Sequence, residues 1–307
     1  MANRGERDSG ESFSRPVRSG LPEASVREAV RFFPVGGGER DTGQAPFTKT
    51  LRSETIQETV AEEFALTVYA DGAELVTLVG SPTDLEELLM GFLTSESVID
   101  GPKDVRWMAI DPERGEAWVT TRDGRAGRAR ERLFRHPVVT SCCGRARVGA
   151  YFASDTALLG LRPFPAVLHI TPSQVTALMK EMEERTRRSL FGMTGGVHSA
   201  LLARPDGEVL ALRNDIGRHN ALDKLYGYSL MQSIDTGGTL IAFSGRISSE
   251  VLLKVAKIGS PILVSKAAPT SLALDWASEL GLTTIGFVRG DRITVYTGRE
   301  RVESTSP

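Results

Sequence analysis

Alternating apolar and polar residues in the first half of the chain predict two pairs of strands around one helix. The first pair flanks Asp71-Gly72, a dipeptide typical of tight hairpin turns. Thr83, followed three residues later by Glu86, predicts the capped start of a helix whose apolar residues recur at helical spacing. The predicted elements are strands at 65–69, 75–79, 105–110 and 116–121 and a helix at 83–93.

From Val167 onward, helical and strand patterns follow one another along the chain. Thr171-Pro172 predicts the start of a helix that continues to about Arg188. The expected elements after it are strands at 208–212, 239–243, 261–265 and 283–287 and helices at 216–231, 249–258 and 271–280. Such alternation is typical of an α/β layer built on a mixed, largely parallel sheet.

The pattern divides the chain into three segments. Residues 1–45 are rich in Gly, Arg, Glu and Ser and predict a flexible leader outside the fold, with at most one short helix near residues 23–33. Residues 46–165 predict a smaller N-terminal strand and helix domain, and residues 166–302 predict the α/β domain.

Composition narrows the classes of function. The 307 residues are 40% hydrophobic and 25% charged, enough for a substantial core. The net charge of -2 provides no global positive field for a long nucleic acid, so an anionic ligand must be held locally. No stretch approaches the roughly 20 apolar residues of a membrane span. Only two cysteines are present, which favours a reducing cytoplasm over a disulfide framework.

The two cysteines are adjacent, at Cys142 and Cys143, in a segment rich in Ser, Gly and Arg. Arg135, Arg145 and Arg147 lie close in sequence, and positive charge favours the reactive thiolate. The other interpretation is that these are small buried hydrophobic side chains. The four histidines are scattered without paired spacing, so the sequence predicts no zinc site.

Two stretches of the second half suggest anion binding. Gly195-Gly196 allows close backbone approach before His198, and Asp215 is placed to cap a helix carrying Arg218 and His219 in its first turn. A glycine pair alone is weak evidence, and Asp215, Arg218 and Lys224 could equally form an ordinary solvated helix face.

Arginines also follow two predicted strands, in Ser244-Gly245-Arg246 and in the segment 287–292. Ligands of open α/β sheets bind at the carboxyl ends of strands, where arginine can grip phosphate with two hydrogen bonds. The sequence contains neither a P-loop nor the dinucleotide-binding glycine motif. We therefore expect a phosphate-bearing ligand to be held by side chains at this edge.

Taken together, these motifs resemble the FdhD family, the sulfur carriers accessory to formate dehydrogenase. The likeness spans about residues 50–300 and rests on Asp84-Leu85-Glu86-Glu87-Leu88, Thr194-Gly195-Gly196-Val197-His198, the stretch from Asp215 to Lys224, Ser244-Gly245-Arg246, Ala268-Pro269-Thr270 and Gly286-Phe287-Val288-Arg289.

The resemblance implies a cytoplasmic homodimer with a core similar to the cytidine deaminase fold. It implies that sulfur arrives from a cysteine desulfurase as a cysteine persulfide. The sulfur then passes to the bis-guanine-dinucleotide form of the molybdenum cofactor, which goes to formate dehydrogenase. Guanine nucleotides are expected to bind as mimics of this cofactor. The expected cofactor contacts are Gly195, Gly196, His198, Arg218, His219, Arg246, Phe287, Val288, Arg289, Gly290, Asp291 and Arg292.

The cysteines depart from the family pattern. Many members carry Cys-Gly-x-Cys-Gly, whereas this chain has Ser141-Cys142-Cys143-Gly144. Since only Cys143 precedes a glycine, we expect it to carry the persulfide, with Cys142 as a helper thiol. Two other functions stay open: a scaffold that binds the cofactor without covalent sulfur transfer, and a hydrolase on a deaminase-like fold, which the missing metal ligands disfavour.

Overall fold

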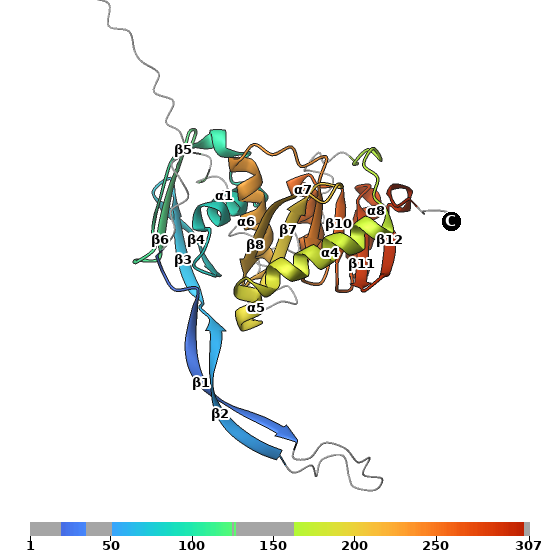
Figure 1. The fold of residues 1–307 in the computed structure, drawn as a ribbon. Helices are drawn as coiled ribbons and strands as arrows, with labels where there is room; N and C mark the ends of the chain where they lie inside the picture. Colours follow the sequence, from blue (N-terminus) through green and yellow to red (C-terminus); the bar gives the residue numbers. More distant parts are fainter. Residues whose placement is uncertain (1–19, 35–50, 125, 127–162, 304–307) are drawn as a thin grey trace, which may run out of the picture.

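The computed structural model describes residues 20–34, 51–124, 126 and 163–303. It has a mixed α/β architecture with two sheets in its body and a two-stranded arm (Figure 1). The predicted likeness to cytidine deaminase stays a prediction.

The arm corrects the interpretation of the N-terminal segment. It consists of β1 (Ala24–Pro34) and β2 (Leu51–Ala61), paired antiparallel. Residues 23–33 were predicted to be at most a short helix in a leader outside the fold, and that prediction is wrong. Ser25 to Phe33 alternate in the period of a strand, but a strand is favoured here only because residues 51–61 pair with it.

The N-terminal part of the body is a four-stranded sheet covered by one helix. Its strand order is β4-β3-β6-β5, and the predicted hairpin at Asp71-Gly72 is confirmed, with both residues at positive φ. The elements are β3 (Phe64–Ala70), β4 (Ala73–Gly80), α1 (Leu85–Ser95), a short 3-10 turn (Pro102–Asp104), β5 (Val105–Asp111) and β6 (Glu116–Thr121).

Helix α1 does not begin as the capping pattern predicts. Its N-cap is Asp84 in the left-handed conformation, and no side chain caps it. The Thr83 hydroxyl instead accepts a hydrogen bond from Lys224 Nζ at 3.1 Å. The predicted cap was wrong because a charged residue of the other half of the chain competes for the threonine.

The C-terminal part has three layers around a six-stranded sheet of order β12-β11-β10-β9-β7-β8. Helix α4 packs on one face, and α6, α7 and α8 pack on the other, each through its own buried apolar cluster. The elements are α4 (Pro172–Arg187), α5 (Leu190–Thr194), β7 (His198–Ala203), β8 (Val209–Asp215), α6 (Arg218–Met231), β9 (Leu240–Phe243), α7 (Ser249–Ile258), β10 (Ile262–Ser265), α8 (Ser271–Glu279), β11 (Thr283–Arg289), β12 (Arg292–Thr297) and a 3-10 turn (Arg299–Arg301).

This sheet is mixed rather than largely parallel. Only β9, β10 and β11 run parallel, whereas β7, β8 and β12 are antiparallel to their neighbours. The difference arises because β7 and β12 were not anticipated, and each forms a hairpin with an adjacent strand. The predicted helix after Thr171 is confirmed, and Thr171 and Gln174 form a complete capping box.

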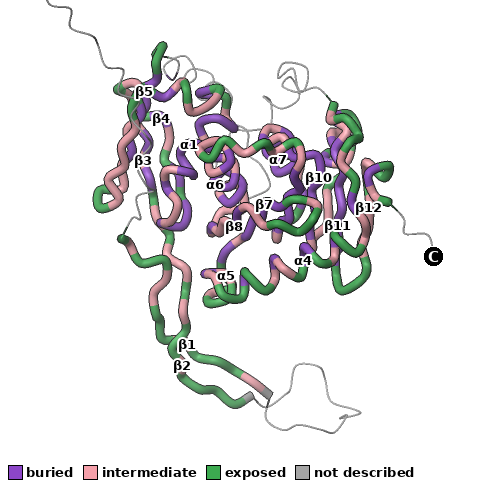
Figure 2. Tube along the Cα trace, turned by 45° about the horizontal axis from the view of Figure 1, so that its top comes forward, coloured by how far each residue is buried: buried purple, intermediate pink, exposed green. Residues whose placement is uncertain are grey.

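The two parts of the body meet where α1 packs along α6. The helices approach closely because Gly91 of α1 faces the Asp223 carbonyl and Gly227 of α6 faces the Glu87 carbonyl, so that a Cβ at either glycine would overlap backbone. Figure 2 shows α1 and α6 beside each other, with buried residues on both helices. The described helices include none long and apolar enough to cross a membrane.

Candidate functional site

One edge of the six-stranded sheet gathers several predicted site residues. The parallel strands β9, β10 and β11 end there, and β7, which runs the opposite way, begins there at His198. The loops are in contact: Ile247 bridges to Pro269, and the Phe287 N–H donates to the Ala267 carbonyl at 3.4 Å. We call this edge, with His198, residues 244–247, 266–269 and 286–287 and the first turn of α6, the sheet rim.

His198 lies at the centre of the rim. Its ring stacks on Phe243 with centroids 6.5 Å apart, and its Nδ1 lies 3.5 Å from Ser244 Oγ. A Cβ on Gly245 would lie 2.9 Å from the Phe243 ring and 3.4 Å from His198 Nδ1, so only glycine fits here. Burial lowers the pKa of His198, and the charge of Arg218 adds to the effect. The ring is therefore neutral at physiological pH.

His219, in the first turn of α6, is the second neutral histidine. Its Nε2 lies 3.2 Å from Glu250 Oε2 on α7. Burial lowers the pKa of His219 to about 3, with Lys254, Arg218 and His198 contributing in the same direction. Because the ring is neutral at physiological pH, this contact is not an ion pair. Glu250 was not anticipated, because nothing in its local sequence distinguishes it from an ordinary first-turn glutamate.

Arg218 supplies positive charge between the two histidines. It is half-buried, and its Nε is shielded from solvent without a hydrogen-bond acceptor among the described residues. Because α6 begins at Arg218 with no side-chain cap at Gly217, the N-terminal dipole of a 14-residue helix adds to the positive potential. Arg246 is exposed on the adjoining loop. An anion at the rim would meet two guanidinium groups and two neutral imidazoles.

Only the start of the segment 287–292 lies at the sheet rim, and the rest forms the hairpin between β11 and β12. Phe287 adopts φ 50 at a bulge in β11 and touches the rim through its backbone. Val288 is buried under α4. Arg289 and Arg292 pair across the hairpin and are exposed, and Gly290-Asp291 form its turn, where Asp291 lies 3.7 Å from Lys180 of α4. A left-handed non-glycine residue is strained, and such strain concentrates at functional positions.

The glycine pair has a structural explanation. Gly195 ends α5 as a left-handed C-cap, where glycine is favoured, and its N–H donates to the Phe191 carbonyl. A Cβ on Gly196 would lie at an ordinary 3.6 Å from Ala61 of the arm. The pair therefore positions the entry to β7, and contact with a ligand stays a prediction for both residues.

Most of the stretch from Asp215 to Lys224 lies inside the molecule. Asp215 and Lys224 are completely buried and pair at 2.7 Å, and Asp215 also accepts from the Ser81 N–H at 2.9 Å. Asp223, one residue earlier, pairs with Lys254 of α7 at 2.6 Å and accepts from Ser95 of α1. Neither a solvated face nor a helix cap describes these residues, because the charges hold α1, α6 and α7 together.

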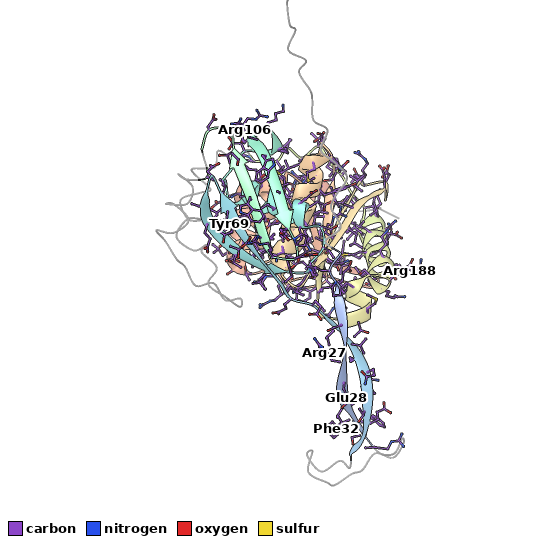
Figure 3. All side chains as sticks on the ribbon, turned by 90° about the vertical axis from the view of Figure 1, so that its left-hand side faces the viewer. Arg27, Glu28, Phe32, Tyr69, Arg106 and Arg188 are labelled. Atoms are coloured by element: carbon purple, nitrogen blue, oxygen red, sulfur yellow. The ribbon has the colours of Figure 1, made fainter. Side chains whose placement is uncertain are left out.

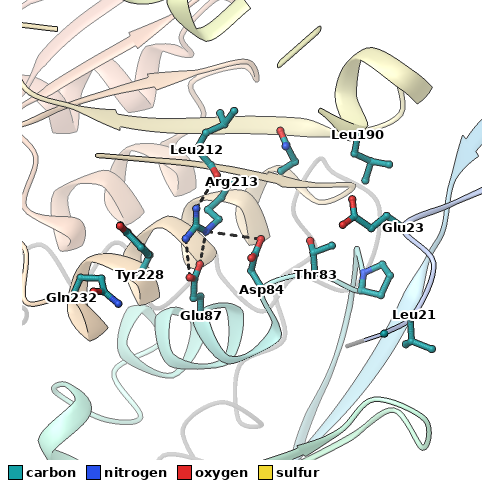
Figure 4. Close-up of a pocket in the computed structure, with 13 residues that line it drawn as sticks. Leu21, Glu23, Thr83, Asp84, Glu87, Leu190, Leu212, Arg213, Tyr228 and Gln232 are labelled. Carbon is teal, nitrogen blue, oxygen red and sulfur yellow. Dashed lines mark hydrogen bonds and ion pairs between the residues drawn. The ribbon is translucent and has the colours of Figure 1, made fainter. Parts of the chain in front are cut away.

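A cavity of about 640 Å³ lies elsewhere, between the base of the arm, α1, β8 and α6 (Figure 4). It contains none of the predicted site residues. The Arg213 guanidinium forms a two-pronged ion pair with Glu87 and lies 4.4 Å above the Tyr228 ring. Burial raises the pKa of Glu87, and Arg213 acts against that shift. Three carboxylates, Glu23, Asp84 and Glu87, line the cavity beside the single Arg213, so it does not suit an anionic ligand.

Cys142 and Cys143 lie outside the described residues. Within residues 20–34, 51–124 and 163–303, no three His, Cys, Asp or Glu side chains are grouped as metal ligands. The described part is thus a mixed α/β protein with arginines and neutral histidines gathered at one sheet edge.

The chain belongs to the FdhD/NarQ family, whose sequence profile matches residues 61–303. It is 44% identical over 247 residues to the sulfur carrier protein FdhD of Listeria monocytogenes serovar 1/2a, which covers 80% of this chain and 92% of that protein. It is also 44% identical over 259 residues to the sulfur carrier protein FdhD of Geobacillus kaustophilus, covering 84% and 95%.

A solved structure from Desulfotalea psychrophila, described as a formate dehydrogenase accessory protein, shares the fold. Its TM-score is 0.67, with 23% sequence identity, over 92% of this chain and all of that one. At this identity the likeness concerns the fold alone.

Proposed function

We propose that this protein is a sulfur carrier that takes sulfur as a cysteine persulfide and passes it to the molybdenum cofactor used by formate dehydrogenase. The observation that carries the proposal is the 44% identity, over four-fifths of the chain, to relatives named sulfur carrier protein FdhD. The partners are a cysteine desulfurase as donor and formate dehydrogenase as recipient. The protein acts as a homodimer in the cytoplasm.

The thiolate of Cys143 is the acceptor in this proposal. It attacks the outer sulfur of the desulfurase persulfide, the sulfur–sulfur bond of the donor breaks, and the donor leaves as a thiolate. Cys143 then carries the outer sulfur, and no net electrons have moved. Release of that sulfur as sulfide needs two electrons, which two thiols supply by forming a disulfide. Cys142 assists as a neighbouring thiol.

The rim suits a cofactor with several phosphates and two guanines as cargo. Arg218 supports this assignment, since its buried Nε lacks an acceptor in the part of the chain that the structure describes. Gly245 supports it as well, because a side chain there would fill the space against His198. In the proposal Arg218 and Arg246 bind phosphate, and the neutral imidazoles of His198 and His219 offer hydrogen bonds. Arg289 and Arg292 extend the basic surface.

Sulfur transfer is tested by intact mass after incubation with a cysteine desulfurase and cysteine. We expect the mass to increase by one sulfur atom, and a reducing agent to remove it. Cys143→Ala should abolish this gain and the maturation of formate dehydrogenase in a complementation assay, whereas Cys142→Ala should only weaken both. Full maturation by a variant lacking both cysteines would refute covalent transfer and favour a scaffold.

Cofactor binding is tested by calorimetry with guanine and adenine nucleotides. We expect guanine nucleotides to bind more tightly. Arg218→Ala and Arg289→Ala should each lose a charge-assisted hydrogen bond, which costs roughly 1.5–3 kcal/mol or about 10- to 150-fold in affinity. Arg106→Ala, an exposed arginine of β5, is the matched control. Equal affinity for both bases, or no loss in either rim variant, would count against this site.

A further inference from the structure

The β1–β2 arm projects from the body as an isolated two-stranded ribbon (Figures 1 and 2). Each strand has 11 residues, and the pairing from Ala24–Ala61 to Pro34–Leu51 contains no bulge. A two-stranded ribbon is at best marginally stable alone in water, because neither face is covered. This arm therefore needs a surface to pack against.

The two faces of the arm differ in chemistry. One face carries ion pairs between Arg27 and Glu62 at 3.7 Å and between Arg31 and Glu58 at 3.2 Å. On the same face Arg52 lies 4.9 Å above the Phe33 ring. Ile56 and Val60 also lie on this face, but its charged side chains keep it in contact with water.

The opposite face exposes large apolar side chains, with one charged residue, Glu28, between Val26 and Val30. Val26, Val30 and Phe32 are 61%, 54% and 63% exposed and, two or four residues apart, they point the same way. Figure 3 shows Phe32 near the far end of the arm, clear of the body. The residues opposite them on β2 are uncharged: Thr59, Thr55 and Ser53. A face with three exposed large apolar side chains and a single charge, on a ribbon whose other face carries most of the charges, is typical of a docking surface.

We propose that the apolar face of the arm packs on a second copy of this chain, so that two copies hold each other by exchanged arms. The area favours this occupant. One face of an 11-residue ribbon is about 37 Å long and about 10 Å wide, or roughly 350 Å². A single arm on another protein buries about 700 Å² in total, less than a stable interface needs. Two exchanged arms bury about 1,400 Å², which is within the standard range.

This inference supplies the surface of the homodimer that the proposed function includes, but it does not depend on sulfur transfer. The family profile begins at residue 61, the last residue of β2. The arm thus precedes the region that the family profile matches.

The test is the mass of the full-length protein by light scattering over a range of concentrations. We expect a dimer for the wild type and a monomer for Val30→Glu/Phe32→Glu, with the dimer dissociation constant raised about 100-fold or more. Ala29→Glu is the matched control, since it adds the same side chain to the charged face, between Arg27 and Arg31. It should remain dimeric. Thermal unfolding of the body should be alike in all variants at concentrations where each is monomeric.

Three results would overturn the proposal. A wild type that is monomeric at all concentrations would leave the face to a different protein. A dimer that survives Val30→Glu/Phe32→Glu would place the interface elsewhere, without bearing on the persulfide assay. Equal dissociation in Ala29→Glu would show that the arm, but not its apolar face, matters.

Discussion

The interior between β8 and α6 and the β1–β2 arm both contain acid–base pairs, but water reaches only one of them. Asp215 and Lys224 pair at 2.7 Å with no exposed surface, whereas Arg31 and Glu58 pair at 3.2 Å with about half of each side chain exposed. A buried pair must be complete, because a single charge left in the interior is strongly destabilising. An exposed pair contributes little and mainly keeps its face in water. Ion pairs thus hold the body together at one place and keep the arm in contact with water at the other.

The largest effect should come from breaking the buried pair. Lys224→Met removes the partner of Asp215 and the donor to Thr83 and to two carbonyls. We expect the free energy of unfolding to fall by about 3–5 kcal/mol, measured by urea denaturation. A loss below about 1 kcal/mol would mean that water or a neighbouring group replaces the lysine.

A smaller loss is expected from closing the gap between the helices. Gly91→Ala introduces a methyl group against the Asp223 carbonyl, which only a shift of α1 can accommodate. The cost should be about 2–3 kcal/mol in unfolding free energy. Gly101→Ala is the control, because nothing lies within 4 Å of a Cβ there. Equal stability of the two variants would show that α1 and α6 slide freely.

The third effect depends on pH and comes from His219. Its pKa is about 3 in the folded protein against an ordinary value of 6.5, so the unfolded chain binds the proton more readily. Stability due to the neutral ring is complete above pH 6.5 and falls as pH decreases towards 3. Between pH 7 and 5 the loss should be about 2 kcal/mol. His219→Gln should reduce this pH dependence, as measured by urea denaturation at both values, and an unchanged slope would assign it to another group.

The smallest effect is expected in the arm. Arg31→Ala removes an exposed ion pair, and the free energy of unfolding should change by less than about 1 kcal/mol, less still in high salt. The measurement is the same denaturation series as for Lys224→Met. If Arg31→Ala lowered the free energy of unfolding as much as Lys224→Met, the exposed and the buried ion pair would not differ in their contribution to stability.

The local sequence was sufficient to predict those elements whose structure depends only on neighbouring residues. The Asp71-Gly72 hairpin and the Thr171 capping box were predictable because turn and cap chemistry depends on a few adjacent residues. β1 and β7 were missed, because each depends on a partner strand. The prediction of a largely parallel sheet was wrong for the same reason. The alternation of helices and strands along the chain does not reveal the hairpins at the two sides of the sheet.

The site was predictable in part. The strand-end rule predicts Arg246 and Phe287 at one rim, as found, whereas His198 reaches the same rim at the start of β7, a strand that was not predicted. The sequence did not indicate that Asp215 and Lys224 are buried. A run of polar residues has the same sequence pattern whether it contacts water or another helix. Glu250 was not foreseen, since its meeting with His219 depends on how α6 and α7 pack.

The close crossing of α1 and α6 also limits how the chain can be divided. A cut near residue 165 would leave Arg213 without Glu87 and Asp223 without Ser95, so neither fragment keeps a complete interior. We expect the two fragments to fail alone but to reassemble when produced together. The two fragments would then behave as the halves of a split protein. The amount of folded complex that they form would measure the strength of the α1–α6 contact.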